Sequence, residues 1–156
     1  MAYTITKDGF SISDDKLLLD IHVIHHYLSK ESYWSKNIPL QVVQKSIDGS
    51  VCFGIYEGNK QIGFARVITD KASFGYLADV FILNAYRGKG LSKWLMKCIL
   101  EHPELQNFRR WMLATKDAHG LYSQFGFKPL EQPERIMGLL LFSEYPAQTI
   151  KEENNS

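Results

Sequence analysis

The sequence predicts an α/β protein with one mixed sheet, mostly antiparallel with a single parallel strand pair, and with helices on both faces of the sheet. Three observations lead to this fold class. Two helical patterns precede residue 50, three segments rich in β-branched and aromatic residues follow, and the second half alternates helix and strand. Short loops join antiparallel neighbours, whereas a helical crossover makes two strands parallel.

Two helices are predicted before the sheet. The first is expected to begin after Asp14 or Asp15, because a short carboxylate can accept hydrogen bonds from the N–H groups of an opening turn. Its apolar residues recur at helical spacing, namely Leu17, Ile21, Ile24 and Leu28. The second helix is predicted from Pro39 to about Ile47, with Gly49 placed to stop it.

Three strands with short connections are predicted next, and they form an antiparallel meander. They are Val51–Tyr56, Gln61–Asp70 and Phe74–Leu83. Residues 57–60 between the first two strands are typical of a hairpin loop.

The second half is predicted to alternate helix and strand. An amphipathic helix runs from Gly88 to about Leu100, and a strand covers Arg110–Thr115. A short helix at Asp117–Phe125 and a last strand at about Ile136–Leu141 complete the pattern. Residues 1–142 are expected to form one domain, and 143–156 a C-terminal tail that is partly disordered.

Composition narrows the classes of function. The chain has 156 residues, and its formal charge of +1 argues against a nucleic-acid module, which needs a strongly basic face. Its apolar runs are too short to span a bilayer, so no membrane partner is expected. Its first residues lack the pattern of a secretion signal, which makes the cytoplasm the expected location. Cys52 and Cys98 lie among apolar neighbours far apart in sequence, so no metal site is expected.

The turn before the helix at residue 88 has the features of an anion site. A strand leads through this turn directly into a helix, whose first N–H groups point outward beside Arg87 and Lys89. Glycine at positions 88 and 90 lets the backbone approach an anion closely. A plain solvated turn remains the alternative, and the spacing matches neither a dinucleotide-binding loop nor a P-loop.

Two motifs about 30 residues apart carry a resemblance to a known family. Tyr86–Leu91 reads Tyr-Arg-Gly-Lys-Gly-Leu, and Ala118–Phe127 contains Leu-Tyr-Ser-Gln-Phe-Gly-Phe. Together they resemble the GNAT superfamily of N-acetyltransferases, over a region from about Val51 to Leu141. The resemblance implies the GNAT-like central sheet. It also implies direct transfer of an acetyl group from acetyl-CoA to a primary amine of a small molecule or peptide, with both substrates bound.

The resemblance also implies where the cosubstrate binds. The backbone from Arg87 to Ser92 would hold the pyrophosphate, and the main chain of Val80–Leu83 would bind the pantetheine arm. The implied cofactor-binding residues are Val80, Phe81, Ile82, Leu83, Arg87, Gly88, Lys89, Gly90, Leu91, Ser92 and Thr115. Ala85 stands where the family often has Gln or Arg, and Thr115 stands where the family often has Asn.

Two residues are candidate catalytic groups. By the resemblance, Tyr122 corresponds to the family's tyrosine near the CoA sulfur, where a phenol can protonate the leaving thiolate. Asp79 is the preferred general base, because a carboxylate among apolar neighbours is costly to bury unless it is paired or functional. The alternatives are a packing role for Tyr122 and a structural pair of Asp79 with Arg66. Other candidate bases are Glu57, Asp117 and His119.

The acceptor is expected to enter from the face opposite CoA. Substrate-binding candidates there are Tyr33, Trp34, Arg66 and Tyr76, in a region that would also contain Asp70 and Phe74. Aromatic faces and an arginine suit a cationic amine or a peptide terminus, although Tyr33 and Trp34 could also serve packing alone.

Two other functions are compatible with the same sequence. One is a non-catalytic CoA-binding or interaction domain of this fold, and the other binds a different phosphate ligand at the turn. A homodimer through an exposed sheet edge is also compatible with the predicted strands.

Overall fold

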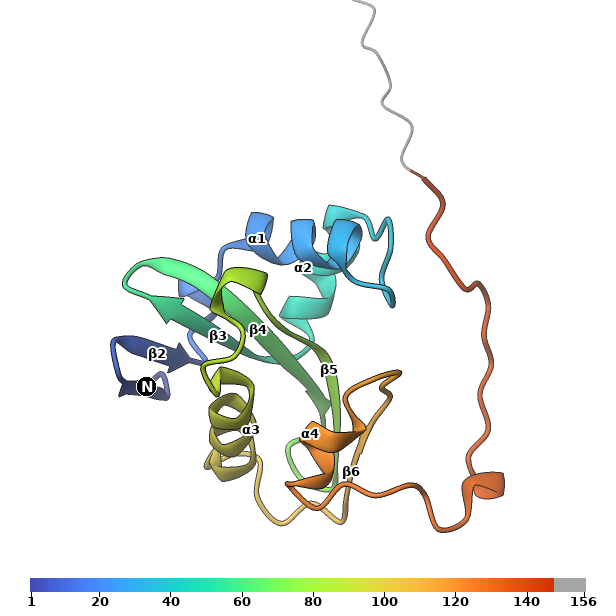
Figure 1. Ribbon diagram of the computed structural model, residues 1–156. Coiled ribbons are helices and arrows are strands. Elements are labelled where there is room, and N and C mark those ends of the chain that lie inside the picture. Colours follow the sequence, from blue (N-terminus) through green and yellow to red (C-terminus); the bar gives the residue numbers. More distant parts are fainter. Residues whose placement is uncertain (148–156) are drawn as a thin grey trace, which may run out of the picture.

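The computed structural model describes residues 1–147, which contain one six-stranded sheet with the strands in chain order (Figure 1). All neighbouring strands are antiparallel except the last two, which are parallel. The strands are β1 (Thr4–Lys7), β2 (Phe10–Ser13), β3 (Val51–Glu57), β4 (Lys60–Thr69), β5 (Phe74–Ile82) and β6 (Arg110–Leu113). The predicted mixed sheet, with its parallel pair around a helix, is therefore confirmed.

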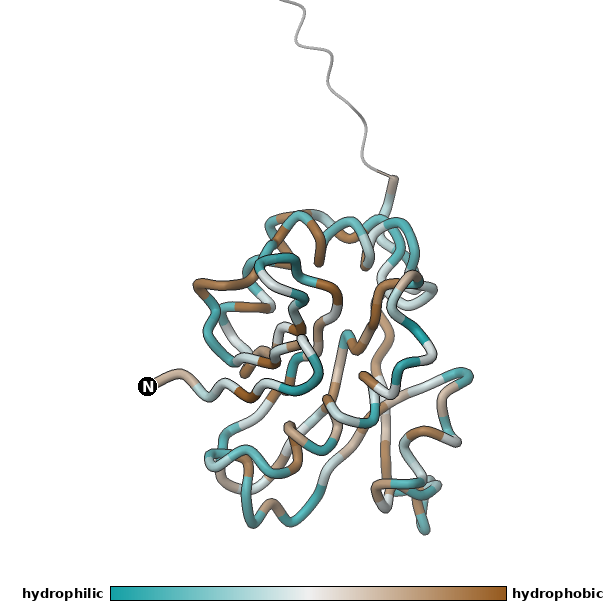
Figure 2. The backbone as a smooth tube through the Cα atoms, turned by 60° about the vertical axis from the view of Figure 1, so that its left-hand side comes forward, coloured by the Kyte–Doolittle hydropathy of each residue, from teal (hydrophilic) through white to brown (hydrophobic). Residues whose placement is uncertain are grey.

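Helices cover both faces of the sheet. They are α1 (Ile21–His26), which continues as a π-helical turn over Tyr27–Glu31, α2 (Leu40–Asp48), α3 (Leu91–Glu101) and α4 (His119–Ser123). Figure 1 shows α1 and α2 on one side of the strands and α3 and α4 on the other. In the turned view of Figure 2 the α1–α2 layer stays above the strands, with alternating apolar and polar turns.

Alternation along the strands divides the apolar residues between two cores. In β3, the side chain of Cys52 enters the core under α1 and α2, whereas that of Phe53 enters the core under α3. The larger core continues through Leu95 and Ile99 of α3 to Tyr122 of α4. Both predicted core cysteines are buried and free.

The N-terminal region differs from its prediction. Residues 4–13 form the β1–β2 hairpin, which the sequence analysis missed although Asp8-Gly9 is a typical hairpin turn. Asp15 caps only a 3-10 turn at Lys16–Leu18. Helix α1 begins after Asp20, whose carboxylate accepts hydrogen bonds from the N–H groups of His22 and Val23. The predicted start of the first helix was therefore several residues too early.

The predicted last strand at Ile136–Leu141 is also wrong. A 3-10 turn at Pro133–Arg135 precedes these residues, and they then run exposed with no strand paired to them. A strand needs a neighbour for its N–H and C=O groups, and the chain is not placed beside one here. Of the C-terminal tail predicted at 143–156, residues 148–156 lie outside the described residues. Within residues 1–147, no helix is long and apolar enough to cross a membrane.

Candidate active site

The site begins where β5 and β6 diverge. Their parallel ladder ends at the pair Leu77 and Leu113, but β5 continues to Ile82. Residues 78–82 therefore have β4 on one edge and no β6 partner on the other. Leu83 N–H donates to Ile62 O of β4 at 2.8 Å. Because main-chain groups alternate along a strand, Val80 and Ile82 direct theirs to the open edge.

A β-bulge bends β5 at this point. Arg66 pairs with Ala78 and Phe64 with Phe81, so Asp79 and Val80 together lie opposite the single residue Ala65. Asp79 has a φ of +54°, a left-handed conformation that asparagine and aspartate tolerate better than other non-glycine residues. Such strain concentrates at functional sites.

The carboxylate of Asp79 is bound on both oxygens. Arg66 Nε donates to Oδ2 at 2.6 Å, and Trp34 Nε1 donates to Oδ1 at 2.8 Å. The Arg66 guanidinium also donates to Ser50 Oγ at 3.2 Å. The ion pair between Arg66 and Asp79 that sequence analysis held as an alternative is therefore present, and the paired carboxylate still faces a cavity.

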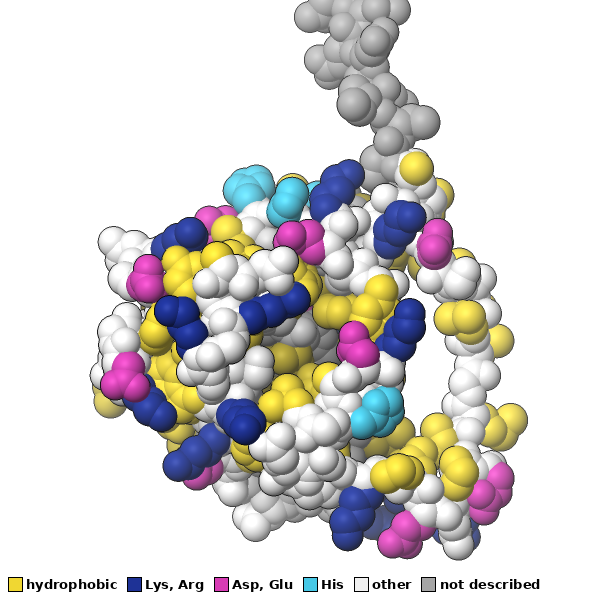
Figure 3. Space-filling model, viewed as in Figure 1, with side chains coloured by type: hydrophobic (Ala, Val, Ile, Leu, Met, Phe, Trp, Pro, Cys, Tyr) yellow, Lys and Arg dark blue, Asp and Glu magenta, His cyan; other side chains and the backbone are white. Residues whose placement is uncertain are grey.

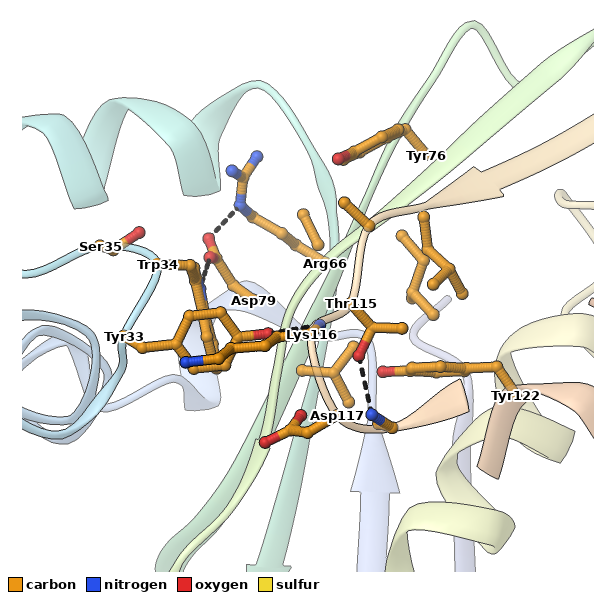
Figure 4. Close-up of a pocket in the computed structure, with 16 residues that line it drawn as sticks. Tyr33, Trp34, Ser35, Arg66, Tyr76, Asp79, Thr115, Lys116, Asp117 and Tyr122 are labelled. Carbon is orange, nitrogen blue, oxygen red and sulfur yellow. Dashed lines mark hydrogen bonds and ion pairs between the residues drawn. The ribbon is translucent and has the colours of Figure 1, made fainter. Parts of the chain in front are cut away.

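This cavity has a volume of about 470 Å³ and collects many of the predicted residues (Figure 4). The predicted residues that line it are Tyr33, Trp34, Arg66, Tyr76, Asp79, Val80, Thr115, Asp117 and Tyr122. Its other lining residues are Ser35, Leu77, Ala78, Leu113, Ala114, Lys116 and Ala118. Loop 32–37, the β5 bulge and the segment after β6 thus form its walls.

Tyr122 comes to the cavity from α4 and is buried. Burial, followed by the nearby Tyr33 and Asp117, raises the pKa of its phenol to about 12. The hydroxyl therefore stays protonated at neutral pH and can donate a hydrogen bond or a proton. In Figure 4 this hydroxyl is directed toward Thr115, whose own Oγ1 accepts the N–H of Ala118 at 3.0 Å.

A hydrogen bond at Tyr33 joins two walls of the cavity. Its hydroxyl accepts the backbone N–H of Lys116 at 2.9 Å, and the Lys116 ammonium lies 5.5 Å from the centre of its ring. The loop before α2 is therefore joined to the segment after β6, across the opening between the diverging strands.

The turn before α3 has the geometry expected of an anion cradle. Gly88 and Gly90 have φ values of +79° and +75°, and a Cβ added at either would enter open space. The N-cap Gly90 supplies no side-chain acceptor for the first N–H groups of the eleven-residue α3. These N–H groups and the exposed Lys89 are suited to phosphate.

Arg87 has a different environment from the one predicted. Its Nε donates to Ile82 O at 3.1 Å, and its Nη2 donates to the Tyr27 hydroxyl at 2.9 Å. Tyr27 in turn stacks on Phe81, with the ring centres 3.9 Å apart. Arg87 therefore ties the turn to β5 and α1 as well as carrying charge.

Several predicted residues lie outside the cavity. The side chains of Phe81 and Ile82 belong to the cores. The main chain of Phe81 pairs with Phe64 of β4 and the C=O of Ile82 accepts from Arg87, so of these two residues only the N–H of Ile82 is available to a ligand. Asp70 instead caps the β4–β5 turn. Its carboxylate accepts hydrogen bonds from the hydroxyl of Ser73 and from the backbone N–H groups of Ser73, Ala72 and Phe74, and these bonds lower the pKa of the carboxyl. The candidate bases outside the lining are Glu57 and His119, and the acceptor candidates outside it are Asp70 and Phe74.

Sequence reasoning missed the roles of Ser35 and Lys116 in this site. Lys116 follows Thr115 directly, but its N–H partner Tyr33 is 83 residues away, and no local pattern reports such a pair. Among residues 1–147, no three His, Cys, Asp or Glu side chains are grouped so that they could hold a metal ion.

Comparison with known proteins identifies the class. The profile of the acetyltransferase (GNAT) domain matches residues 48–129. A crystal structure of a GNAT-family protein from Xanthomonas campestris pv. campestris, provisionally named an acetyltransferase, is 48% identical with a TM-score of 0.84, and the match covers 87% of this chain and 96% of that one. The chain belongs to the GNAT family of acetyltransferases.

More distant relatives agree with this assignment. A Gibberella zeae protein, provisionally named an acetyltransferase, is 28% identical over 155 residues, 86% of this chain and 88% of its own. A crystal structure of a Clostridium acetobutylicum protein with acetyl-CoA is 16% identical, with a TM-score of 0.61 over 90% of this chain and 97% of that one. This last likeness concerns the fold alone.

Proposed function

We propose that the protein transfers the acetyl group of acetyl-CoA directly to a primary amine of a small molecule or peptide. One observation carries the proposal. The open edge of β5 leads from the turn at residues 87–92 to a cavity that has Asp79 on one wall and a protonated tyrosine, Tyr122, on another.

The residues present fit acetyl-CoA. The glycines at 88 and 90 leave open space beside the N-terminus of α3, which suits the pyrophosphate. Main-chain groups of Val80 and the N–H of Ile82 face the edge where an extended pantetheine arm would add like a strand, whereas the C=O of Ile82 already accepts from Arg87. Leu83 contributes less, because its N–H and C=O already bond to Ile62 and Tyr86. A fold relative from Clostridium acetobutylicum holds acetyl-CoA.

The proposed reaction forms a C–N bond and breaks the thioester C–S bond. The amine nitrogen attacks the acetyl carbonyl carbon and loses a proton to Asp79, directly or through a water molecule. The departing thiolate takes a proton from the Tyr122 hydroxyl, so the products are an amide and a free thiol. Each Asp79 oxygen accepts one hydrogen bond, from Trp34 or Arg66, and keeps a lone pair for this role.

Direct transfer is favoured over an acetylated cysteine. Cys52 and Cys98 are buried, and neither lines the cavity. Burial raises the pKa of the Cys52 thiol to about 11 and also raises that of Cys98, so both stay protonated and are poor nucleophiles.

The acceptor pocket suits a compact amine flanked by polar groups. Tyr33, Trp34 and Tyr76 provide aromatic faces for a cation, while Arg66 and Lys116 provide positive charge for a carboxylate or peptide carbonyl. The two positive charges of Arg66 and Lys116 are balanced by the two negative charges of Asp79 and Asp117. This balance favours acceptors that carry both a positive and a negative charge.

Thiol release in the presence of an amine panel tests the proposal. The panel contains the common amino acids, spermidine and a tripeptide with a free N-terminus, and mass spectrometry identifies the acetylated product. We expect amine-dependent thiol release that Asp79→Asn and Tyr122→Phe reduce strongly. Tyr3→Phe is the matched control, because Tyr3 packs on His102 away from the cavity. Acetyl-CoA binding without thiol release from any amine would favour a non-catalytic CoA-binding domain.

A further inference from the structure

Arg66 keeps hydrogen-bond donors that its pair with Asp79 does not use. A guanidinium has five N–H donors, and two of them are bound, from Nε to Asp79 and from Nη1 to Ser50 Oγ. The other three have no hydrogen-bond partner among residues 1–147. The Arg66 side chain is only 17% exposed and lines the acceptor cavity. Unpaired guanidinium donors at the wall of a cavity are suited to an anionic partner, above all to a carboxylate.

Tyr76 lies beside these donors. The register of β4 with β5 places Ala78 opposite Arg66 and Tyr76 opposite Ile68. Arg66 and Tyr76 therefore lie on the same face of the sheet, at diagonal positions. In Figure 4 the Tyr76 hydroxyl is directed toward the Arg66 guanidinium. This hydroxyl has no hydrogen-bond partner within residues 1–147, and Tyr76 lines the same cavity, so two kinds of donor converge on one end of it.

The pair of Arg66 and Asp79 presents both charges side by side. Asp79 Oδ2 lies 2.6 Å from Arg66 Nε, and each carboxylate oxygen still has a lone pair. A free α-amino acid has the opposite arrangement, because one carbon atom separates its ammonium from its carboxylate. Its ammonium can contact Asp79 while its carboxylate contacts Arg66 and Tyr76. An amine without a carboxylate leaves the remaining Arg66 donors without an acceptor in a confined site, which is costly.

The cavity fits a compact acceptor. The hydrogen bond from Lys116 N–H to the Tyr33 hydroxyl, 2.9 Å long, crosses the opening between β5 and β6. A polypeptide laid along this opening would meet that hydrogen bond, whereas an amino acid fits within the volume of about 470 Å³. Figure 3 shows the surface hollowed between the α1–α2 layer and α4, with basic and acidic side chains both present around the hollow. This shape favours a small molecule over a chain.

We infer that the acceptor is a free α-amino acid, whose carboxylate is bound by Arg66 and Tyr76 and whose amine is placed at Asp79. The inference rests on the proposed acetyl transfer and narrows its substrate class. The ammonium loses two protons in the reaction. One leaves to solvent through Asp79, and the other replaces the proton that Tyr122 gives to the departing thiolate. The C–N bond forms and the thioester C–S bond breaks, so the products are an N-acetyl amino acid, CoA and one proton.

Acceptors matched in their side chains test the carboxylate requirement. The common amino acids are assayed singly by thiol release, and each one that reacts is compared with its primary amide and with the amine that lacks the carboxylate. The amide has the lower amine pKa, because it lacks the neighbouring negative charge, so it would react faster if nothing bound the carboxylate. We expect kcat/KM at pH 8 to be higher for the free amino acid by about 10-fold or more. Equal or faster thiol release from the amide, from spermidine or from a tripeptide would overturn the inference and leave the proposed acetyl transfer intact.

Two substitutions test the assigned residues. Tyr76→Phe should raise KM for the amino acid about 10- to 100-fold, because the lost hydrogen bond is to a charged group, and should leave kcat/KM for the amide unchanged. Arg66→Lys keeps a cation beside Asp79 but loses the planar fork, so the preference for the free amino acid should also fall. Tyr3→Phe is the matched control away from the cavity and should change neither acceptor. A preference for the free amino acid that survives both substitutions would overturn the assignment.

Calorimetric titration of the same compounds into the protein with CoA measures the carboxylate site without catalysis. We expect the free amino acid to bind, its amide to bind at least about 10-fold more weakly, and Tyr76→Phe to remove the difference. Absence of thiol release from every amine would overturn the proposed function, whereas this titration would still decide the carboxylate site. No binding of any common amino acid at millimolar concentration would overturn the inference.

Discussion

The indole N–H of Trp34 donates to Oδ1 of Asp79 at 2.8 Å and so ties the loop between α1 and α2 to the bulge in β5. Arg66 holds the other carboxylate oxygen from β4. Three segments distant in sequence thus orient one buried acid at the wall of the cavity, where an acceptor amine is proposed to bind.

Trp34→Phe tests the orienting role of this hydrogen bond. The change keeps an aromatic ring. Because Trp34 is 38% exposed and its indole is an uncharged donor, the unfolding free energy should fall by only about 1 kcal/mol. We expect kcat/KM for the acceptor to fall several-fold with KM for acetyl-CoA unchanged, as measured by thiol release. Trp94→Phe on α3, outside the cavity lining, should leave kcat/KM unchanged. Equal losses in both variants would remove the orienting role.

Arg66→Met tests the buried ion pair. The substitution leaves the Asp79 carboxylate without its cation, which should cost about 3 kcal/mol of unfolding free energy in urea. Adding Asp79→Asn should recover part of that loss, because the unpaired charge is removed. The exposed pair of Lys71 and Glu104 is the control, and Lys71→Met should cost less than about 1 kcal/mol. Additive losses in the double variant would mean that the pair does not couple.

Tyr122→Phe tests the proposed acid. Burial raises the pKa of this phenol to about 12. The wild-type phenol therefore stays protonated from pH 6 to pH 10, because even pH 10 is about two units below this pKa. The wild-type kcat should therefore show no alkaline decline in this range from Tyr122. The variant should lose about 100-fold in kcat at every pH while it binds acetyl-CoA normally. A wild-type kcat that falls as pH rises from 8 to 10 would contradict this assignment.

Stability should decrease at alkaline pH. The Cys52 thiol has a pKa raised from about 9 to about 11 by burial, so between these values the unfolded chain loses its proton while the folded chain keeps it. In this range the native state binds more protons than the unfolded state. The contribution of this thiol to stability is therefore constant below about pH 9 and falls by about 2 kcal/mol as the pH rises to about 11.

Urea unfolding under reducing conditions at pH 8 and pH 10.5 measures this loss. Cys52→Ala should be less stable than the wild type at pH 8 because it leaves a small cavity, but should lose less stability on going to pH 10.5. An identical pH dependence in the two proteins would contradict a buried, protonated Cys52.

The central elements could be predicted because their signals are local. β-branched and aromatic runs predicted β3, β4 and β5 to within a residue or so at each end. The apolar spacing predicted α3, although its start was predicted at Gly88, three residues before Leu91. The parallel arrangement of β5 and β6 followed from the crossover helix between them. Tyr122 lies on the predicted short helix because its motif carries the spacing of that helix and the following glycine.

Contacts between distant segments could not be predicted. The bond from Lys116 to Tyr33 and the stack of Tyr27 on Phe81 depend on how the α1–α2 layer lies over the sheet, which no local pattern specifies. The strand predicted at Ile136–Leu141 is wrong, because an apolar run in the sequence does not report whether a strand has a neighbour. Among the described residues no strand is paired with this segment.

Thermal unfolding with acetyl-CoA, CoA and ATP tests the central claim, that the turn at 87–92 and the open edge of β5 hold acetyl-CoA. A ligand at about 100 times its Kd stabilises a protein by about 2.7 kcal/mol, so acetyl-CoA and CoA should raise Tm clearly and ATP much less. Gly88→Asp should abolish the rise. Gly9→Asp has nearly the same positive φ in the β1–β2 turn, so it matches the backbone strain and should retain the rise. No shift with acetyl-CoA, or the same shift in Gly88→Asp as in the wild type, would contradict the account.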